Sequence, residues 1–199
     1  ISTDEEGGIV TRVKGMTHFP GPMSLGAADA KDLTEKAARE KGKQLKYLGI
    51  NFNLSPVLDV NINPDNPIVG VRSFGSQPEE VSKLGAAYVE GLQSSNVTAC
   101  AKHFPGHGDT KVDSHLELPI IDHDMERLEG LIITDCMEMN GIVDTYGTAE
   151  GAVKAIQAGA DQVLISHTPL KQIEALQKIK ETVESARIKE SQIDRSLER

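Results

Sequence analysis

Short apolar runs alternate with longer amphipathic segments along the chain, and this order is the main guide to its fold. The apolar runs predict strands, and the amphipathic segments predict helices. Strands that alternate with helices in this way are typical of βα units, which build a parallel sheet. The predicted strands span 49–58, 97–101, 131–134 and 162–165, and residues 1–4 are typical of the end of another strand.

Amphipathic segments predict four helices. Ser76-Gln-Pro-Glu79 has the spacing of a capping box, so one helix is expected to begin there. In the first helix the residues expected to face inward are Leu33, Ala37, Ala38 and Leu45. The helices are predicted over 32–48, from 76 to about 91, over 149–158, and from Thr168-Pro169 onward.

Each predicted strand runs into polar residues at its carboxyl end. In parallel α/β folds the functional site is built where those ends converge, so residues far apart in sequence are expected to share one pocket. The run 102–115 is the richest, because it holds three of the six histidines. The polar residues are Asp59 and Asn61, Lys102 and His103, Asp135, and Ser166 and His167.

These elements predict an α/β fold of the (β/α)8 TIM-like barrel type, but an incomplete one. About five strands are predicted in 199 residues, whereas a whole barrel has eight strands and typically takes about 250 residues. Residues 121–128 resemble a helix start, yet they lead almost directly into the strand 131–134. Segments are therefore expected to be missing before Ile1 and near residues 128 and 129.

The overall charge excludes some partners. The chain has 30 carboxylates against 21 lysines and arginines, a formal net charge of -9, so nucleic acid is not expected as a partner. No stretch approaches the roughly 20 apolar residues of a membrane span, and no signal peptide is recognised. The chain opens on Ile1 rather than methionine, so these patterns leave localisation and oligomeric state open.

The histidine-rich run allows two minor interpretations. The first is metal-dependent hydrolysis, because the run is dense in zinc-type ligands, although it matches no defined zinc signature. The second is phosphate binding by backbone N–H groups at Pro105-Gly-His-Gly108, for which so short a glycine motif is weak support. The possible metal ligands are His103, His107, Asp109, Asp113 and His115.

A third interpretation is acid/base catalysis with a separate carboxylate nucleophile. His115 can give and take a proton near neutral pH, and Asp113 could fix its tautomer and raise its basicity. Asp135 follows the apolar run 131–134, so a buried strand would direct its carboxylate into the pocket, as covalent catalysis requires. Taken alone, Asp135 is more typical of an N-cap for a following turn than of a nucleophile.

Several motifs together resemble glycoside hydrolase family 3, and within it the β-N-acetylglucosaminidase branch. They span nearly the whole chain and occur in the family's order. The matching segments are Asp4-Glu-Glu-Gly-Gly8 with Arg12, Gly49-Ile-Asn51, Ser55-Pro-Val-Leu-Asp59, Arg72-Ser-Phe-Gly75, Lys102-His-Phe-Pro-Gly-His-Gly108, Asp113-Ser-His115, and Ile133-Thr-Asp135 with Met139.

The resemblance implies a partial N-terminal-type barrel domain over residues 1–199, with room for a further C-terminal domain. It implies an enzyme that removes terminal β-linked N-acetylglucosamine from muropeptides or chitin-type oligosaccharides with retention, without metal or cofactor. Asp135 would be the nucleophile, and His115, held by Asp113, the general acid and base. Sugar recognition would fall to Asp4, Arg12, Arg72, Lys102 and His103, while His107 is expected to brace the loop.

Two departures from the family accompany this resemblance. Ile9 stands where many relatives carry arginine, so one wall of the sugar pocket is expected to differ. The family also has a helix, a strand and a loop between the equivalents of Leu128 and Glu129, which are absent here. Phosphorolysis of the same bond remains an alternative, and so does a non-catalytic sugar-binding barrel if the deletion is real.

The sequence as a whole, including residues 187–199, resembles the sequences of relatives from Gram-positive bacteria. This favours a secreted or cell-wall-associated protein, with a cytoplasmic one as the alternative.

Overall fold

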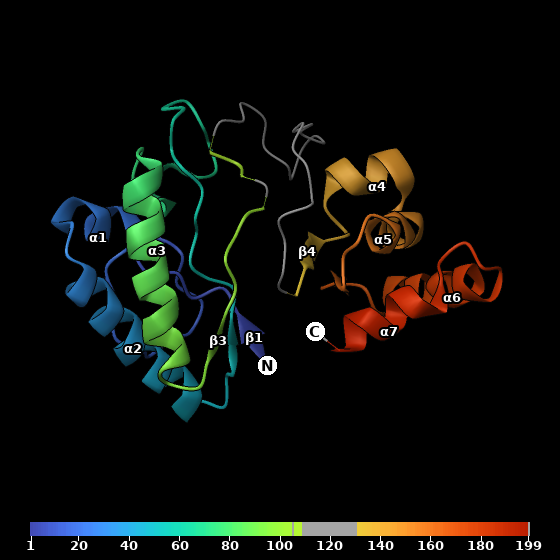
Figure 1. Ribbon diagram of the computed structural model, residues 1–199, viewed down its shortest axis with the longest axis horizontal. Coiled ribbons are helices and arrows are strands. Elements are labelled where there is room, and N and C mark those ends of the chain that lie inside the picture. The colour runs from blue at the N-terminus through green and yellow to red at the C-terminus, as the bar shows by residue number, and fades with distance from the viewer. Residues whose placement is uncertain (105, 109–130, 199) are drawn as a thin grey trace. The chain divides into compact units, whose positions relative to one another are not determined.

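The computed structural model describes residues 1–104, 106–108 and 131–198 (Figure 1). The chain divides into two compact units, Ile1–Lys111 and Val112–Arg199. Each unit combines a few parallel strands with several helices, so the predicted α/β class is correct.

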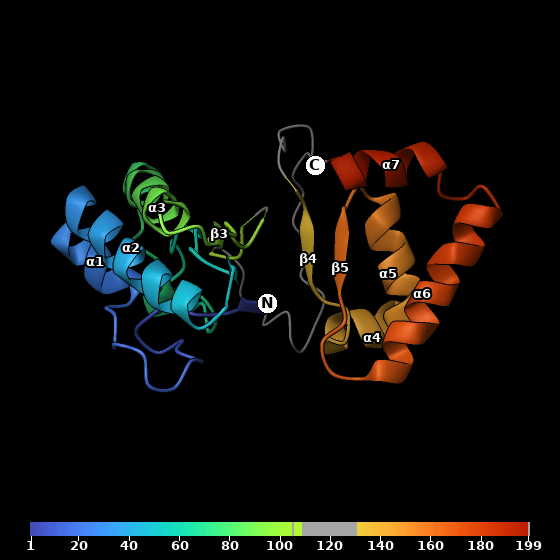
Figure 2. The same cartoon turned by 90° about the horizontal axis from the view of Figure 1, so that it is seen from below.

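The first unit is a parallel sheet of three short strands with helices on one side (Figures 1 and 2). Ser2 pairs with Phe52, and Phe52 with Thr98, which gives the order β1-β2-β3. Its strands are β1 (Ser2–Thr3), β2 (Phe52–Asn53) and β3 (Thr98–Ala99), and its helices are α1 (Pro22–Ala28), α2 (Lys31–Tyr47), α3 (Pro78–Gln93) and the single 3₁₀ turn η1 (Gly70–Arg72).

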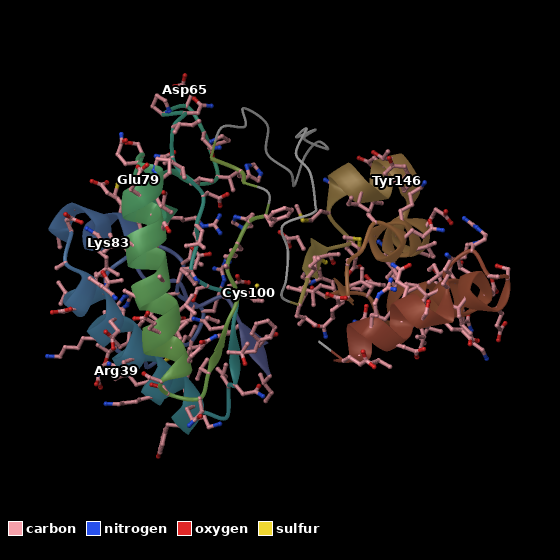
Figure 3. The ribbon with its side chains drawn as sticks, viewed as in Figure 1. Arg39, Asp65, Glu79, Lys83, Cys100 and Tyr146 are labelled. Atoms are coloured by element: carbon pink, nitrogen blue, oxygen red, sulfur yellow. The ribbon has the colours of Figure 1, made fainter. Side chains whose placement is uncertain are left out.

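Helices α2 and α3 pack closely and form the core of this unit. A Cβ atom added at Gly91 would lie 2.3 Å from the carbonyl oxygen of Glu35, so only glycine allows this approach of the two helices. Charged side chains cover the outer surface, where Arg39 pairs with Glu35 and Lys83 with Asp29 (Figure 3). The fully buried core side chains include Ala38, Leu45, Leu84, Tyr88 and Leu92.

Two details of the helix predictions are wrong. Leu33 is 49% exposed, because the packed face of α2 runs through Thr34, Ala38 and Leu45, and Leu33 lies about 100° away from Thr34 around the helix. The expected capping box does not form, since α3 begins at Pro78 behind Gln77, which makes no side-chain cap. Proline is favoured in the first turn, where its missing N–H costs nothing.

Residues 131–198 of the second unit form two parallel strands with helices packed on one face (Figure 2). Met137, Ala152 and Ala175 form one apolar cluster, and Val153, Ile156 and Ile188 form another. Its elements are β4 (Ile133–Cys136), α4 (Asn140–Tyr146), α5 (Thr148–Gln157), β5 (Gln162–Leu164), α6 (Pro169–Glu184) and α7 (Glu190–Glu198).

The five strands of the described residues agree with the sequence prediction in number and parallel direction, although the predicted strand 49–58 is much shorter. Only Phe52–Asn53 forms regular strand, followed by one bridge between Val57 and Lys102. No helix in the described part of the chain is long and apolar enough to cross a membrane.

Candidate functional site

A network of charged side chains lies just beyond the strands of the first unit. Asp4 and Glu6 follow β1, Lys102 follows β3, and Arg72 ends the η1 turn. Their positions agree with the expectation that polar residues gather at the carboxyl ends of parallel strands. The sheet order places β1 and β3 on either side of β2, so the loops after all three strands lie at one edge.

Glu6 is the centre of this network. Its side chain is only 1% exposed, and its carboxylate accepts hydrogen bonds from Arg72 Nε at 2.9 Å and Nη2 at 2.8 Å. Lys102 Nζ lies 2.7 Å from Glu6 Oε1. Burial raises the pKa of Glu6, but the Arg72 hydrogen bonds and the Lys102 charge outweigh it and hold the pKa below its usual value. Glu6 is therefore an ionised, buried anchor for two cations.

Asp4 and Lys102 form the more open part of the same network. Lys102 Nζ lies 2.5 Å from Asp4 Oδ1, and the side chain of Asp4 is 40% exposed. The side chains of Arg72 and Lys102 are 17% and 14% exposed. Each of the three side chains is thus partly exposed, while the Glu6 carboxylate fixes both cations from behind.

Asp59 anchors the second half of the site. His103 Nδ1 lies 2.6 Å from Asp59 Oδ2, and the backbone N–H of His107 donates to Asp59 Oδ1 at 2.5 Å. Burial raises the pKa of Asp59, but the contacts with His103 and His107 outweigh it and lower the pKa. An ionised Asp59 accepts the Nδ1 proton of His103, which leaves Nε2 of that ring for another partner.

The loop around His107 has a structural role, as the sequence indicated. His107 is buried, and its carbonyl accepts a hydrogen bond from Asn66 Nδ2 at 2.6 Å. A Cβ atom at Gly108 would lie 1.9 Å from the carbonyl oxygen of Val60. Gly108 therefore serves close backbone packing, which argues against an anion cradle at this glycine.

Arg12 does not join the network through its side chain, which is exposed. Its backbone N–H donates to Glu5 Oε2 at 2.7 Å, and the N–H of Val13 donates to the same atom at 3.0 Å. In the first unit, Glu5 fixes the loop that carries Arg12. The structure thus brings Asp4, Arg72, Lys102 and His103 into two linked clusters, and leaves Arg12 at the surface.

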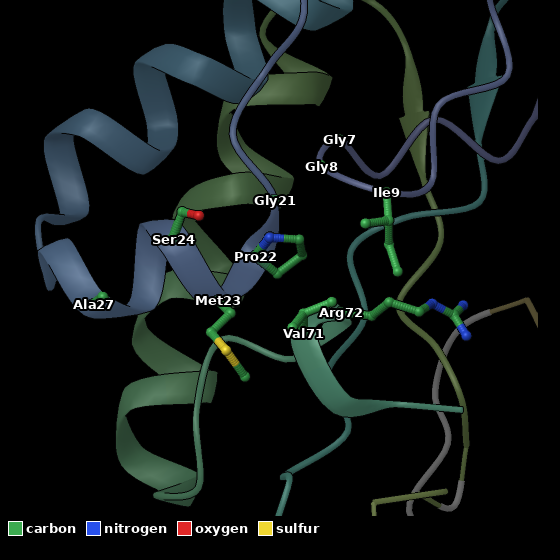
Figure 4. Close-up of a pocket in the computed structure, with 10 residues that line it drawn as sticks. All are labelled: Gly7, Gly8, Ile9, Gly21, Pro22, Met23, Ser24, Ala27, Val71 and Arg72. Atoms are coloured by element: carbon green, nitrogen blue, oxygen red, sulfur yellow. The ribbon is translucent and has the colours of Figure 1, made fainter. Parts of the chain in front are cut away.

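A pocket of about 360 Å³ adjoins Arg72 (Figure 4). Ile9, the residue that departs from the family motif, is 75% exposed and lines this pocket together with Met23 and Val71. Figure 4 shows Ile9 above the stem of the Arg72 side chain, with the guanidinium group pointing away from Val71 and Met23. The wall beside the candidate sugar site is therefore apolar, consistent with the departure seen in the sequence.

The residues proposed for bond cleavage are only partly described. Asp135 lies in β4 of the second unit, is exposed, and accepts a hydrogen bond from the backbone N–H of Cys136 at 2.7 Å. Asp113 and His115 lie outside the described residues, as does Asp109 of the zinc interpretation. Within the described ranges, no group of three or more histidine, cysteine, aspartate or glutamate side chains could hold a metal ion.

Sequence reasoning missed Glu6 as the anchor of the site. It stands in the segment Asp4-Glu-Glu-Gly-Gly8, and three acidic residues in a row directly after a strand were the available signal. A buried carboxylate must be paired, so cations were to be expected beside it, but the sequence does not tell which ones. The sequence indicated Asp59 as a strand-end residue, but it did not predict the hydrogen bond between Asp59 and His103.

Parallel strands with helices on one face, and charged groups gathered beyond the strand ends, define an α/β protein with a candidate polar site. The model of the glycosyl hydrolase family 3 N terminal domain matches residues 1–129 and 128–199. The chain belongs to this family, as its motifs indicated.

Relatives with known names support the same assignment. "Beta-hexosaminidase A" of Pseudoalteromonas piscicida is 47% identical over 133 residues, which cover 64% of this chain and 22% of that protein. "Beta-hexosaminidase LpqI" of Mycobacterium tuberculosis is 40% identical over 117 residues, covering 58% of this chain and 30% of that protein. The chain therefore spans less than a third of the length of either relative.

A solved structure of a family 3 β-N-acetylglucosaminidase from Paenibacillus sp. str. FPU-7 also matches. Its TM-score is 0.93 at 41% identity, over 100% of this chain and 48% of that one. A β-N-acetylhexosaminidase from Beutenbergia cavernae has a TM-score of 0.88 at 25% identity, over 100% of this chain and 76% of that one.

Proposed function

We propose that the protein to which this chain belongs is a retaining exo-β-N-acetylglucosaminidase. It would remove terminal N-acetylglucosamine from muropeptides or chitin-type oligosaccharides. The observation that carries the proposal is the buried Glu6 carboxylate, which holds Arg72 and Lys102 beside Asp4. The names of the relatives point to the same substrate class.

The charge of this network suits a neutral, hydroxyl-rich ligand. Two carboxylates, Asp4 and Glu6, balance the two cations Arg72 and Lys102, so the network carries no net charge at neutral pH. Sugar hydroxyls can donate to Asp4 and accept from the cations, and such charge-assisted hydrogen bonds are stronger than neutral ones. His103, oriented by Asp59, would supply a further polar contact through Nε2.

Cleavage would take two steps. The Asp135 carboxylate would attack the anomeric carbon while His115 donates a proton to the departing glycosidic oxygen, which forms a glycosyl-enzyme ester. His115 would then take a proton from water as the water oxygen attacks the same carbon and releases Asp135. Asp113 would hold the imidazole in the required tautomer during both steps.

Release of p-nitrophenol from p-nitrophenyl N-acetyl-β-D-glucosaminide tests this proposal. We expect Asp135→Asn and His115→Ala each to reduce kcat by about a hundredfold or more, because proton transfer and covalent catalysis each contribute at least that much. Wild-type rates in either variant would exclude the assigned role. Binding of N-acetylglucosamine by a wild-type protein that never hydrolyses the substrate would instead indicate a sugar-binding barrel.

Product analysis tests whether water or phosphate accepts the sugar. Release of free N-acetylglucosamine in the presence and absence of phosphate indicates hydrolysis, whereas a sugar 1-phosphate formed only with phosphate indicates phosphorolysis. The neutral network around Glu6 offers no excess positive charge to attract phosphate, and this favours water.

We also propose that residues 128 and 129 are not covalent neighbours in the parent protein. The family model matches the chain in two segments that meet at these residues. A barrel that lacked strands between them would leave open sheet edges, which natural folds avoid. An active protein with an intact mass of 21.5 kDa would refute this proposal.

A further inference from the structure

Lys41 is a buried lysine directly behind the Glu6 network. It lies on helix α2 and is only 1% exposed. Its Nζ donates hydrogen bonds to the backbone carbonyls of Glu5 at 3.2 Å and Glu6 at 2.6 Å, and to the Tyr88 hydroxyl at 2.6 Å. A buried ammonium is costly unless it is paired and hydrogen-bonded, so a lysine at this position needs a reason.

The two carbonyls that Lys41 binds belong to the segment that directs Glu6 into the site. The N–H groups of Glu6 and Gly7 both donate to the Val10 carbonyl at 3.1 Å, and the Glu5 carbonyl also accepts from Asn53 Nδ2 at 3.0 Å. With Lys41 on the other side, this backbone is fixed from two directions. The Glu6 carboxylate then reaches Arg72 and Lys102.

The surroundings of Lys41 are aromatic and acidic. Its Nζ lies 5.1 Å from the ring centre of Tyr88 on α3 and 5.6 Å from that of Phe19. The charged groups facing it are Glu5 and Glu6, which favour the ammonium form. Burial has the larger effect and lowers the pKa of Lys41 to about 7, while burial raises the pKa of Tyr88. Lys41 therefore changes protonation in the neutral range.

We infer that Lys41 is a positioning residue for the candidate sugar site, acting through the Glu5–Glu6 backbone on the Glu6 carboxylate. Its role rests on the proposed function only where substrate binding is concerned. As an ammonium it has three N–H groups for two carbonyls and one hydroxyl, and as an amine it has two. Loss of the proton turns the charge-assisted hydrogen bonds to the Glu5 and Glu6 carbonyls into weaker neutral ones, and this loosens Glu6.

The test compares Lys41→Met, which keeps much of the aliphatic bulk, with Lys36→Met, an exposed position on the same helix. In the ligand-free protein, NMR hydrogen exchange at the Glu6 and Gly7 amides should rise about tenfold in Lys41→Met, the size expected for losing one or two hydrogen bonds. Lys36→Met should leave both rates unchanged. Unchanged exchange in Lys41→Met would overturn the inference, whether or not the protein hydrolyses the substrate.

A second readout separates positioning from general destabilisation. For p-nitrophenyl N-acetylglucosaminide, KM should rise about tenfold in Lys41→Met with kcat nearly unchanged, because the residue touches no reacting atom. Wild-type KM should increase as pH rises through about 7, a step that Lys41→Met lacks and Lys36→Met retains. A KM step of equal size in Lys41→Met would assign the titration to another group and overturn the inference.

Two further outcomes remain decisive. If Lys41→Met does not fold, Lys41→Gln keeps an N–H donor but no charge, and exchange at the Glu6 amide should rise about threefold. An unchanged rate in that variant would refute the positioning role. If the wild-type protein shows no hydrolysis, the proposed function fails, while the exchange comparison still decides the role of Lys41.

Discussion

The Glu6→Gln substitution tests whether a buried carboxylate holds the site together. Glutamine has nearly the same shape as glutamate but carries no charge, and its amide group presents N–H donors to cations. Arg72 and Lys102 would then face each other without the carboxylate that now accepts three contacts of 2.7 to 2.9 Å. The variant therefore isolates the charge of Glu6 from its packing.

The structure sets the size of the effect. Removing one partner of a buried ion pair costs about 3–5 kcal/mol, because the remaining charge is left uncompensated. Arg72 and Lys102 each keep some contact with solvent, and Lys102 keeps Asp4. We therefore expect the lower end, a loss of about 3 kcal/mol in the free energy of unfolding of the first unit at pH 7.

The effect should depend on pH with a definite sign. The pKa of Glu6 in the folded protein lies below its usual value of 4.5. Its stabilisation is therefore complete above about pH 4.5 and is lost as the pH falls through the folded-state pKa. The stability difference between wild type and Glu6→Gln should be constant from pH 7 to about 5 and shrink at more acidic pH.

Hydrogen exchange of α3 amides in increasing urea measures the stability of the first unit separately from the second. Glu174→Gln, at an exposed position of α6, is the matched control and should change stability by no more than about 0.5 kcal/mol. A loss below about 1 kcal/mol in Glu6→Gln, or a difference that grows on acidification, would refute the assignment of Glu6 as an ionised anchor.

Two other substitutions test the packing and the second anchor. Gly91→Ala should lower the free energy of unfolding of the first unit by about 1–3 kcal/mol, because its Cβ would meet the Glu35 carbonyl. The control Ser82→Ala, on the same helix, should change the free energy of unfolding measured in urea by no more than about 0.5 kcal/mol. Equal stability of both variants would contradict the close approach of α2 and α3. Asp59→Asn should raise KM for p-nitrophenyl N-acetylglucosaminide about tenfold or more, since His103 loses a charge-assisted hydrogen bond, and an unchanged KM would exclude His103 from substrate binding.

Much of the fold could be predicted because apolar periodicity follows directly from burial. The strand positions, their parallel pairing and the existence of α2 and α3 all reflect which residues leave water. Strand length was harder to predict. The segment 49–58 alternates apolar and polar residues over much of its length, yet the regular strand covers only Phe52–Asn53, and pairing resumes in one bridge between Val57 and Lys102. Pro56, between these two parts, has no N–H to donate to a sheet.

The candidate site shows a different limit. Lys102 and His103 were recognisable because they directly follow a strand, and Asp4 because it belongs to a family motif. The partners of Glu6 lie 66 and 96 residues further along the chain, and no local pattern records which cation a carboxylate meets. Lys41 was equally hidden, because a lysine in an amphipathic helix is ordinarily a surface residue.

The buried charges explain why this part of the site suits a neutral ligand. Asp4 and Glu6 balance Arg72 and Lys102, and Asp59, whose pKa is lowered by its contacts with His103 and His107, is a further carboxylate nearby. An anion placed here would meet no excess positive charge and would face Asp4. A sugar with hydroxyl groups can instead donate to Asp4 while it accepts from Lys102 and Arg72. The same pairing that makes burial of Glu6 possible therefore favours a polyol over phosphate as the bound group.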